Sequence, residues 1–463
     1  MRWEIKLLIF VIFLILVYHY SLNSWNPYGY PPDYYDSAYH VAQTKNIIKN
    51  NFMFPLKEPN AFYGRPYAYP PLFHYLAAIV AVFSNEFFSV WLLGNVFVIA
   101  IIPAGAYLCY LISKKNLFAL ILGTFLFGTT SATLLYWKFG YYGNIVGNFF
   151  TVISLICFYL VSEKKLDWKF LSLSIFLVII SSVINAVFLV LSYLIFFTIT
   201  LYFGIKKHDF SSKTLPWFLG KSLFFAILFS SPWIIRSFGE YITYWTHPFQ
   251  QLPLPTIYYY IPFLLLIPFA FRKNNLFYVL TIYILLILGF WLPNAIGEAP
   301  RMISLAFIPL YPFACAAFSK LFEFSSNTNS LKKFSFLIII VILIWALSNN
   351  YKGYEHTPSP TSLDKDRIIF YENIKDIVDN NDTIIANNMW VMVISERNTT
   401  RADEPSLKFF RDLESLSFKQ NLAEIENSYN MNFTYIVSVR SNTLDENTKE
   451  VLSDRDLVLY KII

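Results

Sequence analysis

Apolar runs separated by short polar segments occupy the first three quarters of this 463-residue chain. A run of about 20 apolar residues is long enough for a helix to cross the roughly 30 Å hydrocarbon core of a bilayer. The pattern therefore predicts a polytopic all-α membrane region with about eleven transmembrane helices. Their expected ranges are 6–22, 88–112, 116–136, 144–161, 169–185, 186–204, 216–236, 256–271, 275–292, 302–321 and 333–348.

One apolar segment, Leu72–Phe83, is too short to span the bilayer. If it crossed, the lysine pairs 114–115 and 164–165 would lie outside, against the tendency of basic residues to stay on the cytoplasmic side. We therefore predict that it is an interfacial helix of a first external loop and that the N-terminus is cytoplasmic. The basic residues that then share the cytoplasmic side are Arg2, Lys6, Lys114, Lys115, Lys164, Lys165, Lys206, Lys207, Arg272, Lys273, Lys332 and Lys333.

The pattern changes near Asn349, where charged and polar residues become frequent. Residues 364–380 predict a helix, and residues 382–387, 433–439 and 456–463 predict short strands. We therefore divide the chain into a membrane region, 1–348, and a small α/β domain, 349–463. An odd number of spans from a cytoplasmic N-terminus makes this domain extracytoplasmic.

Composition agrees with an integral membrane protein in contact with membrane lipids. Hydrophobic residues make up 56% of the chain and charged residues only 14%, against about 25% charged residues in a soluble domain. The net charge of +6 comes from lysines clustered between apolar runs, so no nucleic-acid partner is expected. The three cysteines lie in apolar runs without paired spacing, which indicates buried hydrophobic residues.

The polar segment 31–75 carries the residues of chemical interest. Asp33 and Asp36 follow the first apolar run, so an acidic pair is expected near the bilayer surface, where it can meet a lipid substrate. Residues 36–48 predict a helix that begins at Asp36 or Ser37, where the helix dipole favours a carboxylate. Its expected apolar stripe consists of Ala38, Val41, Ala42 and Ile48.

Four features follow one another in this loop: Asp36, then Tyr39-His40, then Phe54-Pro55, and then Gly64–Leu72 with its Tyr69-Pro70-Pro71-Leu72 step. This order resembles the first external loop of the GT-C class of membrane glycosyltransferases, which includes aminoarabinose transferases, protein O-mannosyltransferases and oligosaccharyltransferase catalytic subunits. The resemblance implies a GT-C-like fold, in which Asp36 is the catalytic carboxylate and the Pro-Pro step opens a second helix of the loop.

The resemblance also implies an activity. An inverting enzyme of this kind transfers a sugar from a polyprenyl-phosphate donor to an extracytoplasmic acceptor, which is a lipid-linked glycan, a lipid or a protein. A carboxylate beside the acceptor can act as a general base, and Asp36 is the candidate. For Asp33, contact with the acceptor and simple solvation both stay open.

Arginine suits the donor phosphate because its planar guanidinium can make two parallel hydrogen bonds to phosphate oxygens. Arg301 is expected at the external start of a late span, and the resemblance favours a phosphate-binding role for it. The alternatives are an interfacial anchor or an ion pair with Glu298. Further candidates for substrate binding, each with an ordinary structural alternative, are His40, Arg65, His74, Lys138, Tyr142 and Glu298.

We expect no cofactor, because the second external loop, KFGYYGN, has Asn144 and no acid to supply a divalent metal. If a metal does bind, Asp33 and Asp36 are its expected ligands. A metal-dependent enzyme similar to oligosaccharyltransferase is one alternative, although the Trp-Trp-Asp signature is missing near Trp390. A transporter or flippase is another, although the chain shows neither clear repeats nor many mid-span charges.

Overall fold

The computed structural model describes most of the chain. It covers residues 8–9, 11–13, 15, 35–55, 69–129, 140–206, 214–245, 263–264, 266–271, 274–291, 305–325, 365–386, 388, 390–399, 418–429, 432–439, 444, 448–454 and 456–463. The expected span 333–348 lies outside the described residues, as do most of 6–22 and half of 256–271. The side chain of Asp36 is not described either, although its main chain is.

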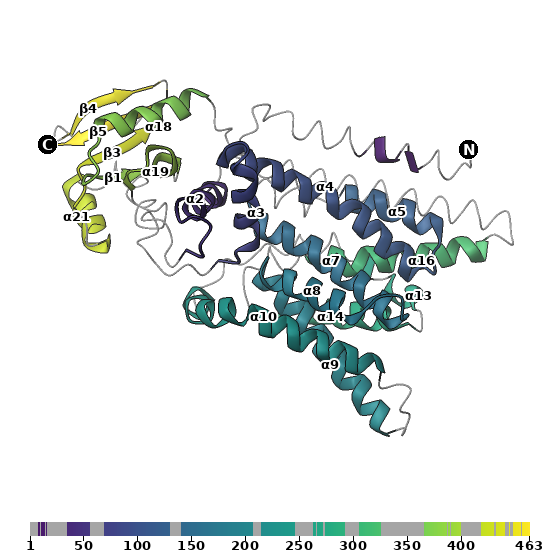
Figure 1. Cartoon of the computed structure of the whole chain (residues 1–463). Coiled ribbons are helices and arrows are strands. Elements are labelled where there is room, and N and C mark those ends of the chain that lie inside the picture. The colour runs from purple at the N-terminus through teal and green to yellow at the C-terminus, as the bar shows by residue number, and fades with distance from the viewer. Residues whose placement is uncertain are drawn as a thin grey trace.

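Helices dominate the first two thirds of the protein (Figure 1). Two short helices belong to the first loop, α2 (Tyr35–Lys49) and α3 (Leu72–Ala81). The remaining helices of this region form a bundle. They are α4 (Glu86–Ile112), α5 (Leu117–Gly128), α7 (Tyr142–Ser162), α8 (Trp168–Ile179), α9 (Val183–Lys206), α10 (Thr214–Trp245), α13 (Ile267–Ala270), α14 (Asn275–Trp291) and α16 (Phe307–Ser325).

Four helices in the described ranges are long and apolar enough to cross a membrane. They begin at Glu86, Tyr142, Val183 and Thr214. The expectation of a full span at 169–185 is wrong, because α8 ends at Ile179 after 12 residues and a turn follows. Helix α3 has 10 residues and is therefore about 15 Å long, too short to cross.

Tight turns join α4 to α5 and α7 to α8. Lys114, Lys115 and Lys164 adopt left-handed main-chain conformations, with φ of 56°, 65° and 55°, which reverse the chain at each helix end. Asn116 and Asp167 then cap the next helix, because their side chains accept hydrogen bonds from its first main-chain N–H groups. The lysine pairs that indicated topology in the sequence are thus the turns themselves.

The helices run alternately toward and away from the first loop. Helices α4 and α7 start beside α2 and α3 and end at the lysine turns. Helix α8 runs back toward the first loop. At its end, the carbonyl of Ile180 accepts a hydrogen bond from the main-chain N–H of Leu72 over 3.0 Å. Helix α9 runs out to Lys206, and α10 brings the Trp233 indole within 3.4 Å of the carbonyl of Tyr69. The lysines of these turns therefore share the end of the bundle opposite the first loop.

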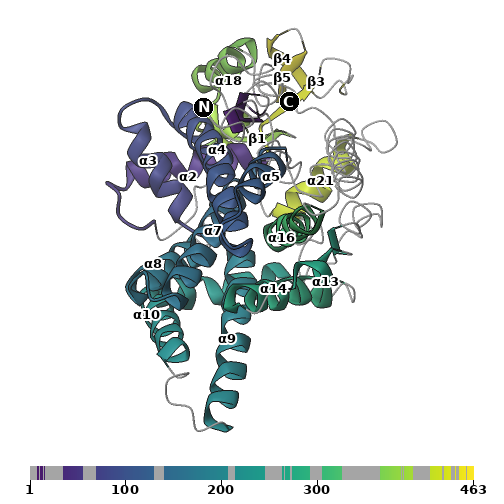
Figure 2. The ribbon, with the colours of Figure 1, turned by 90° about the vertical axis from the view of Figure 1, so that its right-hand side faces the viewer.

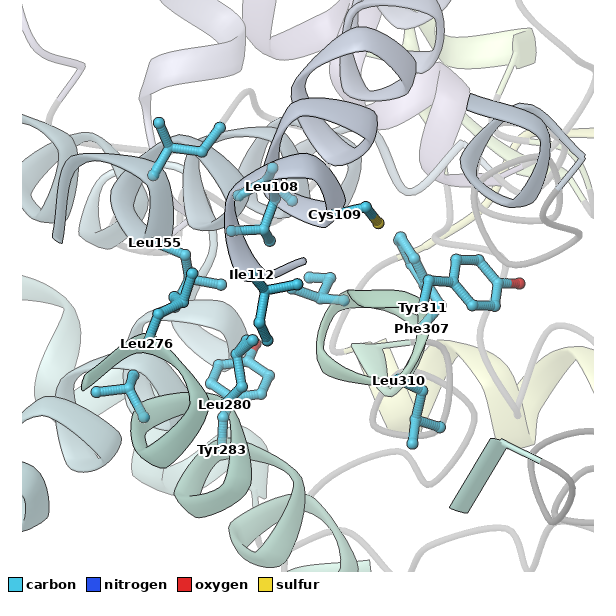
Figure 3. Close-up of a cluster of buried hydrophobic side chains, with 14 of the residues drawn as sticks. Leu108, Cys109, Ile112, Leu155, Leu276, Leu280, Tyr283, Phe307, Leu310 and Tyr311 are labelled. Carbon is cyan, nitrogen blue, oxygen red and sulfur yellow. The ribbon is translucent and has the colours of Figure 1, made fainter. Parts of the chain in front are cut away.

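A continuous apolar core holds the bundle together, and Figure 3 shows the part where α4, α7, α14 and α16 meet. The side chains from these helices are fully or almost fully buried. Van der Waals contacts between them stabilise the packing, because in a bilayer lipid tails are as apolar as the side chains and the hydrophobic effect does not drive helices together. Members of this part of the core are Leu108, Cys109, Ile112, Leu155, Leu276, Leu280, Tyr283, Phe307, Leu310 and Tyr311.

The C-terminal region is a small α/β unit that lies at the opposite end of the molecule from the far end of α9 (Figure 2). Its sheet has the strand order β2-β1-β3-β5-β4, in which β1 pairs parallel with β2 and β3, and β5 pairs antiparallel with β3 and β4. The expected helix and three strands are confirmed as α18, β1, β3 and β5. The elements are α18 (Lys365–Ile377), β1 (Thr383–Ala386), α19 (Trp390–Ser395), β2 (Asn398–Thr399), α21 (Phe418–Tyr429), β3 (Tyr435–Val439), β4 (Thr448–Ser453) and β5 (Leu457–Ile462).

A second core joins this α/β unit to the first loop. It contains side chains of α2 and α3, of the first turns of α4 and α7, and of α18, α19, β1, β3 and β5. Accordingly, α2 and α3 lie between the bundle and the α/β unit in Figure 1. The first loop and the C-terminal unit are therefore on the same side of the bundle.

Polar side chains join α7 to α9 inside the bundle. The hydroxyl of Ser182, just before α9, donates to the side-chain Oδ1 of Asn144 over 2.9 Å. The Asn185 amide nitrogen lies 2.8 Å from Asn148 Oδ1 and 3.3 Å from the Thr151 hydroxyl. Lipid offers amide and hydroxyl groups no hydrogen-bond partner, so at membrane depth such groups must bond to one another, as these do across the two helices.

Close packing at Gly147 makes this contact possible and gives a first prediction. A Cβ atom there would lie 2.5 Å from Ser182 Cβ and 2.9 Å from Asn185 Oδ1, whereas a Cβ at Gly289 of α14 would meet nothing within 4 Å. Gly147→Ala should therefore destabilise the protein by about 1–3 kcal/mol, and Gly289→Ala should be neutral or stabilising by up to about 1 kcal/mol. Thermal unfolding in detergent measures both, and equal effects would contradict the packing of α7 against α9.

Candidate active site

Helix α2 carries the candidate acid. It begins at Tyr35, one residue before the earlier of the two expected starts, so Asp36 lies in its first turn. The first main-chain N–H groups of a helix have no partner inside the helix, and together with the dipole they favour a negative charge there. The expectation that Asp36 lies at a helix N-terminus is therefore confirmed for its main chain.

Burial of α2 is more complete than a partial apolar stripe suggests. Ala38, Val41 and Ala42 are buried as expected, but Ile47 rather than Ile48 is the buried isoleucine. The helix packs against α3, α4 and α19, which cover more than one of its faces.

Polar residues on α2 are buried as well. Ser37, His40, Gln43 and Thr44 are all 0% exposed and follow the helical spacing of three and four residues. The Thr44 hydroxyl donates to the carbonyl of His40 over 2.8 Å. Within the described residues, neither polar atom of the Gln43 amide has a hydrogen-bond partner. Buried polar groups of this kind usually bond to water or to a ligand.

His40 and His74 form a direct hydrogen bond in this polar layer. His40 Nδ1 lies 2.7 Å from His74 Nε2, and both side chains are fully buried. Burial lowers the pKa of His74 well below its usual range, and the neighbouring His40 lowers it further. His74 is therefore neutral at physiological pH. In the bond between the two rings, one nitrogen donates and the other accepts.

Aromatic rings enclose the histidine pair. The His40 ring centroid lies 5.1 Å from that of Phe73, 5.3 Å from that of Tyr142 and 5.4 Å from that of Tyr69, each in an edge-on arrangement. The ring of Tyr142, the first residue of α7, also stacks on Phe73 at 5.1 Å. Three helices, α2, α3 and α7, thus meet at one buried point.

The Pro-Pro step anchors α3 at this point. Pro71 immediately precedes the helix, so the expected start of a second loop helix at Leu72 is confirmed. Tyr69 and Leu72 bond through their main chains to α10 and to the end of α8, as described above. A Cβ added at Gly143 would lie 3.1 Å from both the Tyr69 hydroxyl and the carbonyl of Ser181, which shows how closely α7 approaches the same step.

Of the predicted substrate-binding residues, the structure brings His40, His74 and Tyr142 together in this cluster. Asp33, Arg65, Lys138, Glu298 and Arg301 lie outside the described residues, so their predicted roles stay predictions. The sequence presents the two histidines as separate candidates and does not predict their bond. Gln43 and Ser37 were not predicted as members of the polar cluster either. Their helical spacing from His40, which places them on the same face of α2, could have indicated this.

Comparison with solved structures finds similar folds at low sequence identity. AglB oligosaccharyltransferase from Archaeoglobus fulgidus, in complex with an inhibitory peptide and a dolichol-phosphate, gives a TM-score of 0.62 at 12% identity over 95% of this chain and 69% of that chain. ArnT from Cupriavidus metallidurans gives 0.61 at 9% identity in the apo state, over 97% of each chain. With undecaprenyl phosphate bound, ArnT gives 0.58 at 10% identity over 98% of this chain and 97% of that chain. The sequence matches no protein-family model and no curated protein.

A complex of the A. fulgidus enzyme with Zn and sulfate raises the question of a metal site here. In the described part of this chain, no group of three His, Cys, Asp or Glu side chains is placed to hold a metal ion. His40 and His74 are bonded to each other at 2.7 Å rather than placed around a common ion. The described donor set does not fit a metal.

The histidine bond gives a second prediction. His74→Phe leaves buried His40 Nδ1 without its His74 partner, so the free energy of unfolding should fall by about 1–3 kcal/mol. The double change of His40 and His74 to Phe removes both polar groups and should cost less than the sum of the two single changes. Thermal unfolding of the three variants in detergent measures this coupling, and additive costs would contradict a direct bond.

The arrangement of helices, the small C-terminal sheet and the likeness to AglB and ArnT together establish an integral membrane protein with a GT-C-like fold.

Proposed function

We propose that this protein transfers a sugar from a polyprenyl-phosphate donor to an extracytoplasmic acceptor, which is a glycan, a lipid or a protein. The observation that carries the proposal is the position of Asp36 in the first turn of α2, a helix fixed at the polar end of a GT-C-like fold. The dolichol-phosphate and undecaprenyl phosphate bound by the two structural neighbours support a polyprenyl-phosphate donor.

In the proposed mechanism, Asp36 accepts a proton from the acceptor as the acceptor attacks the anomeric carbon of the sugar. The bond between this carbon and the phosphate oxygen breaks, so the configuration inverts and the polyprenyl phosphate leaves with its electron pair. Arg301, together with Arg65, neutralises the phosphate as it leaves. No step uses a metal.

His74 has a different part in this mechanism from the one that its sequence position suggested. A phosphate ligand needs a charged or solvent-accessible donor, and His74 is fully buried, neutral and bonded to His40. We therefore assign the histidine pair to holding α2 against α3, and so to fixing the position of Asp36. Tyr142 supports the same pair from α7.

The third prediction tests the acid and the phosphate ligand. Asp36→Asn should lower the transfer rate by about 10²- to 10⁴-fold, because a general base is lost, with little effect on donor binding. Arg301→Ala should weaken donor binding as well as transfer, and Asp33→Asn should be milder than Asp36→Asn. The assay uses the purified full-length protein with undecaprenyl-phosphate-linked sugars, a cell-envelope acceptor extract and excess EDTA.

Two results would count against this assignment. If Asp36→Asn retained most of the transfer rate while Asp33→Asn lost it, the roles within the acidic pair would be reversed. Transfer that stopped in EDTA and resumed with manganese or magnesium would make Asp33 and Asp36 metal ligands instead.

The fourth prediction concerns orientation. We propose that the lysine turns face the cytoplasm, and that the first loop and the α/β unit lie outside. Cysteines introduced at the exposed positions Ser84 and Ser453 should then react with an impermeant maleimide in intact cells, whereas one at exposed Lys115 should react only after permeabilisation. If only Lys115→Cys were labelled in intact cells, the lysine turns would face outward and the proposed orientation would be wrong.

A further inference from the structure

The α/β unit contacts α2 through a cluster of charges that the proposed chemistry does not use. Glu396, the residue after α19, lies 3.7 Å from Lys45 and 3.5 Å from Lys49, both on α2. It also lies 3.5 Å from Lys375 on α18. One carboxylate therefore joins the loop helix to two elements of the C-terminal unit.

Lys45 is the more enclosed of the two α2 lysines, with 18% of its side chain exposed. Its ammonium group donates to the carbonyl of Val393 in α19 over 3.0 Å and lies 5.5 Å from the ring centroid of Phe87 in α4. Burial lowers the pKa of Lys45, and the carboxylates of Glu86 and Glu396 oppose that effect. Lys45 thus contacts both the bundle and the α/β unit.

Glu396 occupies a main-chain position that does not favour glutamate. Its φ is 55°, in the left-handed region where glycine or asparagine usually ends a helix. Burial raises the pKa of Glu396, but the three lysines outweigh it and keep the pKa below its usual value. The carboxylate is therefore charged at neutral pH and attracts the three lysine ammonium groups.

The other end of α19 has an aromatic contact with the bundle. The fully buried Trp390 stacks on Phe87 with 5.8 Å between ring centroids. Helix α19 is thus held at its start by an aromatic pair and at its end by the lysine cluster, and α2 lies against it.

We propose that Glu396 is a positioning residue, which fixes α2 through Lys45 and Lys49 and thereby sets the place of Asp36 at the other end of the same helix. The inference rests on the proposed role of Asp36 as the base. Each exposed ion pair is weak on its own, but misplacing a catalytic group by about 1 Å can lower a rate by about 100-fold. A small structural contact can therefore have a large effect on transfer.

Glu396→Gln tests this, because it removes the charge and keeps the size. Glu372→Gln on α18 is the matched control, since this glutamate is exposed on the same unit. Hydrogen exchange of the full-length protein in nanodiscs should show at least about tenfold faster exchange of α2 amides in Glu396→Gln, with α7 and α9 unchanged. The transfer rate should fall by about 10- to 100-fold, while binding of undecaprenyl phosphate stays as in the wild type.

Glu396→Asp keeps the charge at a position that aspartate tolerates, and it should restore slow α2 exchange and most of the transfer rate. Lys49→Met, at a side chain that is 65% exposed, serves if Glu396→Gln does not fold; it should give a smaller change in the same direction. Glu372→Gln should match the wild type throughout.

Unchanged α2 exchange in Glu396→Gln would overturn the inference, whatever the transfer rate. Faster α2 exchange with a wild-type transfer rate would also overturn it, and the proposed function would survive if Asp36→Asn still abolished transfer. If the wild type transferred no sugar, the proposed function would fail, and the positioning of a base would fail with it.

Discussion

The buried hydrogen bond between His40 and His74 is the contact on which the polar end of this protein depends. It joins the two helices of the first loop, which are otherwise too short to be stable alone in water. Both imidazoles are fully buried, so breaking this bond leaves a polar ring atom without that partner away from water. The aromatic rings around the pair exclude water and add their own buried area.

Helix α7 connects the histidine pair to the membrane region. Its first residue, Tyr142, packs on His40 and Phe73. Within the next two turns, Asn144 bonds to Ser182, just before α9, and Asn148 bonds to Asn185 in α9. Inside a bundle these bonds replace partners that lipid cannot offer, although Asn148 Nδ2 and Asn185 Oδ1 have no partner among the described residues. The same helix therefore supports the candidate site at one end and fixes the bundle below it.

The C-terminal unit is part of the same structure rather than an appendage. Its buried side chains share one core with α2, α3 and the starts of α4 and α7. The charged contact at Glu396 lies at the exposed edge of that core, where salt and pH can act on it. Because the pKa of Glu396 is depressed, its contribution is present above the ordinary pKa of glutamate and is lost as the pH falls through the lower folded value.

Local patterns determined the elements of this protein. Long apolar runs predicted the bundle helices, and the polar start at Asp36–Ser37 predicted α2 to within two residues, because capping and burial act over one or two turns. The lysine-rich turns predicted which ends of the bundle helices lie together, since basic residues between spans tend to stay on one side of the membrane.

Tertiary structure alone decided what these elements bring together. The bond between His40 and His74 joins residues 34 positions apart, and the contact of Lys45 with Val393 joins residues 348 positions apart. Burial of Ile47 instead of Ile48, and the end of α8 at Ile179, also follow from neighbours that no local pattern contains. Such contacts depend on how helices distant in the sequence pack together. Close packing decides which side chains touch, and the neighbours of a residue in the chain do not determine it.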